Sequence, residues 1–353
     1  MENSKNTIGI IPENSGNSGY NAKTMRKFSN VNSLMLLIFT ILMIVGSVIG
    51  ATVAENFVGE DSEYYKCIGL IVSMVIQYCV GVPLAILIGR KTKTGRNMET
   101  VRSLFRKPQQ SVGWVVRWVF IGIFLSYGAT LVTSTIFSLI EAITGVKLNQ
   151  TDFSAENNSL SQVINIICIT FMAPLFEECL IRGGMLNNIK RYGSWSAVIS
   201  TGIFFGLLHM NYPQVPFACV MGIVSAFIVL KTNSIIPSII IHFVINSIGG
   251  IMSLFTGNID IEEMDSANIE VIAENIVPYL IIMFCGFLVF GFMITGLVFF
   301  ITEISSHRDS FKLEKVNPEV SEGKKLCHYF TAPLTIILTL FYIGMTILNA
   351  IPQ

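Results

Sequence analysis

Two adjacent carboxylates and an arginine, Glu177, Glu178 and Arg182, stand near the end of a long apolar run. Ionisable groups inside a hydrophobic span cost from about 2.5 kcal/mol each upward, so they are rare and commonly functional. On a helix Glu178 and Arg182 are four residues apart and can pair, whereas Glu177 is rotated about 100° away. The spacing predicts that one carboxylate is neutralised while its neighbour stays available for proton transfer. The alternative is a purely structural ion-pair cluster that anchors the helix end.

Two of the four histidines also lie in apolar runs. His209 ends Phe205-Gly206-Leu207-Leu208-His209, and His242 opens His242-Phe243-Val244-Ile245-Asn246. Residues four apart share a helix face, so Phe205 projects with His209, and His242 with Asn246. Each histidine alone is typical of a hydrogen-bonded packing residue. Because unsatisfied polar groups are expensive in hydrocarbon, we expect both histidines, Asn246 and the two glutamates to share one interior cavity.

Several protease chemistries lack the residues that they need. The chain contains no H-E-x-x-H zinc helix and no G-x-S-x-G serine motif. All five aspartates fall in polar connections between the apolar runs, so a pair of catalytic aspartates has no candidates. A glutamate and a histidine that activate water remain.

The composition is that of an integral membrane protein. Hydrophobic residues make up 52% of the 353 and charged residues only 13%, against about 25% charged in soluble domains, and the mean hydropathy is +0.63. Apolar windows of spanning length fall at 34–54, 67–89, 115–139, 160–182, 194–210, 214–230, 235–255, 276–302 and 332–350. The sequence predicts an all-α integral membrane protein, a polytopic bundle of about nine transmembrane helices. It offers no basic surface for nucleic acid.

Basic residues are concentrated on alternate connections. The N-terminal tail and the segments 90–117, 182–193, 231–234 and 303–331 hold 21 of the 23 lysines and arginines. Since short basic connections stay cytoplasmic, we predict a multi-pass protein of the cell membrane with its N-terminus inside and its C-terminus outside. Residues 1–33 are interpreted as a disordered polar cytoplasmic tail, 34–353 as the helical membrane domain, and 303–331 as a charged cytoplasmic connector.

The three motifs together resemble a known family. E-E-x-x-x-R, F-x-x-x-H and H-x-x-x-N, in this order on successive helices, are similar to those of the CAAX-prenyl-protease and bacteriocin-processing intramembrane endopeptidases, called CPBP or Abi. The resemblance covers about 160–255, which would be the catalytic core. It implies that Glu177 is the general base on water with His209 beside it, that His242 and Asn246 polarise the scissile carbonyl, and that Glu178 with Arg182 orients the first helix.

Metal dependence and substrate stay open at this point. Glu177, His209 and His242 could supply a zinc site with three ligands and an open position, but an asparagine beside a histidine suits an oxyanion hole equally well. The expected substrate is a membrane-associated or lipid-modified protein, or a leader peptide, reached within the lipid bilayer. The alternatives are a catalytically silent immunity or scaffold protein of the same fold and a proton-coupled transporter. The absence of internal repeats disfavours the transporter.

Overall fold

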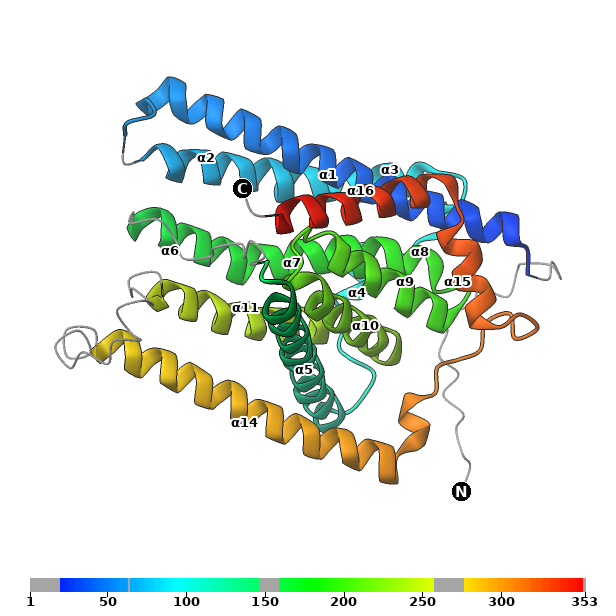
Figure 1. Ribbon diagram of the computed structural model, residues 1–353. Coiled ribbons are helices and arrows are strands. Elements are labelled where there is room, and N and C mark those ends of the chain that lie inside the picture. The colour runs from blue at the N-terminus through cyan, green and yellow to red at the C-terminus, as the bar shows by residue number, and fades with distance from the viewer. Residues whose placement is uncertain (1–19, 63, 147–158, 257–275, 352–353) are drawn as a thin grey trace.

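The computed structural model describes residues 20–62, 64–146, 159–256 and 276–351, and these segments fold into helices joined by short connections (Figure 1). The elements of the first half are α1 (Ala22–Val58), α2 (Tyr65–Met74), η1 (Val75–Gly81), α3 (Val82–Lys91), η2 (Gly95–Asn97), α4 (Val101–Leu104) and α5 (Val112–Thr144). The central elements are α6 (Ser159–Ile167), η3 (Cys168–Met172), α7 (Ala173–Glu178), η4 (Cys179–Leu186), α8 (Asn187–Ile189), α9 (Ser194–Leu207), α10 (Gln214–Thr232) and α11 (Ile236–Thr256). The last are α14 (Ile276–Ser306), η5 (Arg308–Phe311), α15 (Glu322–Phe330) and α16 (Pro333–Ala350).

Eight of the helical stretches in the described segments are long and apolar enough to cross a membrane. The remaining apolar window, 194–210, forms α9, which has only 14 residues. Most of the long helices run roughly alongside one another, and α5 crosses them steeply (Figure 1). The prediction of an all-α polytopic bundle is confirmed.

Three π-helical turns interrupt the spans that surround the predicted site: η1, η3 and η4. Proline accounts for two of them, because it lacks the N–H that an α-helix needs. Pro83 follows η1 and Pro174 follows η3 within two residues of each end. The wide turns change which side chains share a face, so the ordinary spacing rule fails over stretches of several turns that include them.

The expected disordered tail is wrong for residues 22–33, because α1 begins at Ala22. The side chain of Asn21 caps the helix by accepting a hydrogen bond from the Lys23 N–H at 2.8 Å. Met25 and Phe28, one turn apart, are buried in the bundle. Burial of this apolar face outweighs the polar composition of the segment. Residues 1–19 of the expected tail lie outside the described residues.

The basic connections meet at one end of the bundle. Glu99, in the connection after α3, accepts a hydrogen bond from Lys190 at 2.7 Å and pairs with Arg106. The connector 303–331 folds onto the same end, since Glu322 at the start of α15 accepts from the Ser196 N–H of α9 at 2.6 Å. The segments that the charge pattern assigned to one side of the membrane are therefore neighbours in space.

Candidate active site

The predicted ion pair is present. Arg182 Nε lies 3.0 Å from Glu178 Oε2, one turn away, and both side chains are fully buried. The guanidinium also donates a hydrogen bond to the Gly222 carbonyl at 3.2 Å and lies 4.6 Å from the centre of the Phe205 ring. Arg182 thereby joins the span that bears the glutamates to α9 and α10.

His242 of α11 lies between the two carboxylates. Its Nδ1 is 3.3 Å from Glu178 Oε1, and its Nε2 is 3.9 Å from Glu177 Oε2. A carboxylate only accepts hydrogen bonds, so the contact with Glu178 requires the proton on Nδ1; in the neutral imidazole Nε2 is then an acceptor on the side of Glu177. Glu178 is therefore bound by both Arg182 and His242, and it fixes the orientation of the imidazole.

Glu177 is bound through only one of its oxygens. Its Oε1 accepts a hydrogen bond of 2.9 Å from the Tyr78 hydroxyl, whereas Oε2 is buried and has no hydrogen-bond partner within the described part of the chain. The residue is 9% exposed, in contrast to its fully buried neighbour Glu178. The two carboxylates of the motif thus differ as the spacing predicted, since one is paired and the other retains a free oxygen.

Phe205 is the common neighbour of the basic side chains. Besides Arg182, its ring meets the His242 ring edge to face at 5.5 Å and the His209 ring at 5.3 Å. Close approach of α9 and α10 brings it there: a Cβ on Gly202 would come within 2.7 Å of the Ile223 backbone nitrogen. The phenylalanine of the second motif therefore positions charged and ionisable groups through ring contacts.

His209 follows the end of α9 and contacts Phe205 rather than the carboxylates. Its Nδ1 lies 2.9 Å from the Phe205 carbonyl oxygen, which requires the proton on Nδ1 because a carbonyl only accepts. Within the described residues no hydrogen bond or ion pair joins His209 to Glu177. The residue next to Glu177 is instead His242, which the family resemblance had assigned to the scissile carbonyl.

Asn246 is held by a carbonyl that a proline leaves free. In the π-helical register the Ala173 N–H donates to Cys168, five residues back. In the same register the next residue would donate a hydrogen bond to the Ile169 carbonyl, but that residue is Pro174, which has no N–H. Asn246 Nδ2 donates to this carbonyl at 2.9 Å. One N–H of the amide is thereby fixed, and the other remains available to a ligand.

A cavity of about 380 Å³ opens beside Asn246. Its lining residues belong to α5, α6, η3, the start of α10 and α11, and Asn246 is the one residue of the three motifs among them. Its walls consist of Tyr127, Thr130, Asn165, Ile166, Ile169, Pro213, Gln214, Phe217, Ile245, Asn246, Gly249, Gly250 and Ser253. The lining contains hydroxyl and amide groups but no charged side chain.

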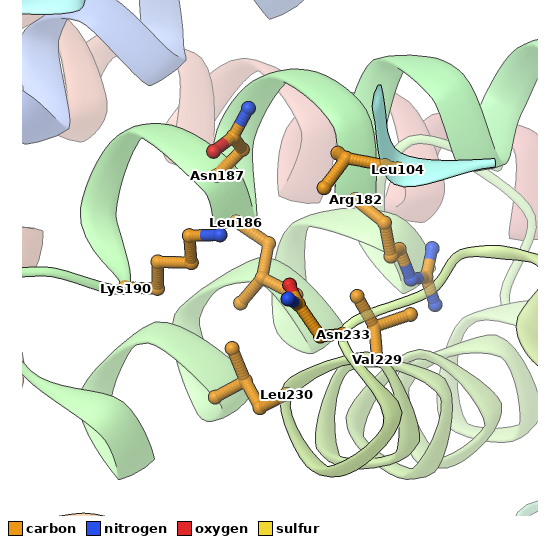
Figure 2. A pocket seen from close by; sticks show the side chains of 8 residues that line it. All are labelled: Leu104, Arg182, Leu186, Asn187, Lys190, Val229, Leu230 and Asn233. Carbon is orange, nitrogen blue, oxygen red and sulfur yellow. The ribbon is translucent and has the colours of Figure 1, made fainter. Parts of the chain in front are cut away.

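A much smaller void borders Arg182 on the side of the connections (Figure 2). Its volume is about 10 Å³, the space of a single water molecule. Leu104, Leu186 and Val229 are among its lining residues, and none of the lining side chains is acidic. The carboxylate in contact with Arg182 is Glu178, and no acidic side chain faces the guanidinium across this void.

The proposed zinc ligands do not form a ligand set. Among the described residues no three histidine, cysteine, aspartate or glutamate side chains lie together as a metal site would require. Glu177 and His242 are neighbours, but His209 is engaged with Phe205. The described residues therefore do not fit a zinc site with three ligands.

Sequence reasoning missed Tyr78 altogether. It lies 99 residues before Glu177 on a different span, and a single tyrosine in an apolar run carries no motif. The one available signal was Pro83, five residues later, which indicates a disturbed helical turn at Tyr78.

Comparison with known proteins adds a family to this geometry. No curated protein and no solved structure matched the chain. Residues 159–248 match the family model described as Type II CAAX prenyl endopeptidase Rce1-like, and all three motifs lie within that segment. The match confirms the resemblance drawn from the motifs, and the similarity lies in the segment that bears them.

Proposed function

We propose that this multi-pass membrane protein hydrolyses a peptide bond of a membrane-associated protein by means of a water molecule activated by Glu177. The observation that carries the proposal is the separation of 3.9 Å between Glu177 Oε2 and His242 Nε2. This distance is too long for a direct hydrogen bond. One water molecule can contact both atoms at about 2.8 Å, and both are acceptors that such a water would satisfy.

The reaction follows from the positions of these groups. Glu177 Oε2 takes a proton from the water as its oxygen attacks the scissile carbonyl carbon. The second N–H of Asn246 donates to the resulting oxyanion. The proton then passes through His242 Nε2 to the leaving nitrogen as the C–N bond breaks, while Nδ1 keeps its hydrogen bond to Glu178. Glu178 and Arg182 act by holding the imidazole in this orientation.

The geometry favours a different division between the histidines from the one that the resemblance implied. His242 contacts both glutamates, so we assign it to the shared water and the proton. His209 presents a free Nε2 lone pair and holds Phe205, so we assign it a supporting role at the edge of the site.

The cavity beside Asn246 supports binding of an uncharged substrate segment. Its hydroxyl and amide lining can bind the backbone of an extended peptide, whereas a charged residue would find no counter-ion and would lose its hydration. The volume of about 380 Å³ lies within the range of small ligand sites. We propose that the chain next to the scissile bond lies here.

The test compares the N- and C-termini of the membrane proteome in cells that carry the wild-type protein or Glu177→Gln. We expect termini that depend on the wild-type protein to disappear with Glu177→Gln. The matched control is Glu303→Gln, which alters a buried carboxylate paired with Arg117 on α14, a helix that carries none of the motifs. Termini that persist at wild-type levels in Glu177→Gln would refute the proposal. Identical termini with and without the wild-type protein would favour a catalytically silent scaffold.

We also propose that the end of the bundle formed by the basic connections faces the cytoplasm. The support is their number of positive charges and their assembly into one layer. Cysteines placed at Arg102 and at Glu60, in a background without native cysteines, would be treated with an impermeant thiol reagent in intact cells. We expect labelling at position 60 only, and labelling at position 102 only would invert the orientation.

A further inference from the structure

We infer that Tyr78 is a positioning residue for hydrolysis, because its hydroxyl holds the Glu177 carboxylate so that Oε2 alone meets the water. The inference rests on the proposed role of Glu177 as the base. Tyr78 precedes the segment 159–248 that matches the endopeptidase family, so the comparison assigns it no role.

The hydroxyl donates the one hydrogen bond that this carboxylate accepts from the described residues. The last torsion of a glutamate side chain is broad and roughly two-fold, so an unbound carboxylate would turn and exchange its two oxygens. The hydrogen bond of 2.9 Å from Tyr78 occupies Oε1. It leaves Oε2 at 3.9 Å from His242 Nε2, where one water reaches both.

The tyrosine is itself held rigidly. It is 4% exposed, and its ring stacks on Phe176 with centroids 5.8 Å apart and meets Phe39 at 6.3 Å. The π-helical turn η1 carries it, and Pro83 sits two residues after that turn. These contacts involve the ring, so they survive removal of the hydroxyl.

The decisive variant is Tyr78→Phe, and Tyr342→Phe is its matched control. Tyr342 is also buried in the membrane domain, and its hydroxyl makes a hydrogen bond of 2.6 Å with Thr40. Both substitutions remove a hydroxyl that makes one side-chain hydrogen bond, and both keep the aromatic ring. Only the first touches the proposed base.

The assay measures kcat and KM of purified, detergent-solubilised protein on a peptide that spans a cleavage site found in the terminus comparison. Rates are normalised to folded protein, and thermal midpoints are recorded. We expect Tyr78→Phe to lower kcat about 10- to 100-fold with KM within about twofold, because a misoriented base slows chemistry without weakening binding. Tyr342→Phe should keep both constants.

Two results would overturn the inference. One is a kcat of Tyr78→Phe equal to that of Tyr342→Phe. The other is a Tyr78→Phe protein that does not fold while Tyr342→Phe folds, which would make the hydroxyl structural. Failure of the proposed function would be seen separately, as retained activity in Glu177→Gln.

Discussion

Replacing Arg182 by methionine will leave Glu178 as an unpaired charge inside the bundle. In the wild-type protein the arginine contributes the contact of 3.0 Å with Glu178, the hydrogen bond to the Gly222 carbonyl and the ring contact with Phe205. Methionine has a similar length and can still cover Phe205, with a favourable sulfur–aromatic contact. The substitution therefore isolates the loss of charge from the loss of packing.

The expected cost follows from the complete burial of both partners. Breaking a buried ion pair by removing one member typically costs about 3–5 kcal/mol, and both side chains here have no exposed surface. Glu178→Gln should cost a similar amount, because it leaves the guanidinium uncompensated. The double variant Glu178→Gln/Arg182→Met buries no charge at this pair. We expect it to lose only about 1–2 kcal/mol, from the hydrogen bond and the cation–π contact.

The assay is unfolding in mixed micelles by added denaturing detergent, followed by tryptophan fluorescence, with cleavage measured on the same samples. Stability should recover in the double variant while activity does not, because the variant lacks the carboxylate that accepts the hydrogen bond from His242 Nδ1. Costs that simply add in the double variant would refute the pairing argument. A double variant with wild-type turnover would refute the orienting role of Glu178.

Three further predictions concern the site and the connections at the basic end of the bundle. His242→Gln should abolish turnover and His209→Gln should lower kcat less, since only His242 contacts the carboxylates; equal losses in single-turnover assays would contradict the division. Gly249 lines the cavity, and a Cβ added to it would meet open space. Gly249→Leu should therefore occupy part of the cavity and raise KM, whereas Gly286→Leu on α14 should leave KM unchanged. Burial raises the pKa of Glu99, but hydrogen bonds and charge from its basic partners outweigh that effect and hold it below its usual value. The Glu99 carboxylate therefore stabilises the fold above its unfolded pKa of about 4.3, and this stabilisation is lost as pH falls through the lower folded pKa. Glu99→Gln should lower the thermal midpoint at neutral pH but not in acid, as midpoints measured across pH will show.

Local spacing predicted the part of the site that depends on neighbours about one turn apart on the same span. The pairing of Glu178 with Arg182 follows from a separation of four residues, and the structure has it at 3.0 Å. The long apolar windows likewise predicted the bundle, because spanning length and composition decide which segments enter the membrane.

Contacts between spans could not be predicted in the same way. Periodicity defines a face on each helix but not the rotation of one helix against another, so it did not distinguish His242 from His209 as the neighbour of Glu177. The wide turns η1 and η3 change the rotation further. The start of α1 was missed for another reason, since Met25 and Phe28 are too few to mark an apolar window within a polar segment.

The shortness of α9 has a consequence for the supply of the second reactant. Its 14 residues extend about 21 Å at 1.5 Å per residue, whereas the hydrocarbon core is about 30 Å thick. From Ser194 the chain therefore turns back through His209 and Pro213 after less than a full span. Side chains of α16 and α5 cover this turn, since Asn349 donates to the Met210 carbonyl at 2.9 Å and the Phe137 ring meets the Tyr212 ring at 4.6 Å. Hydrolysis consumes one water molecule per turnover, and the polar groups at this turn offer it hydrogen bonds at a depth where lipid offers none.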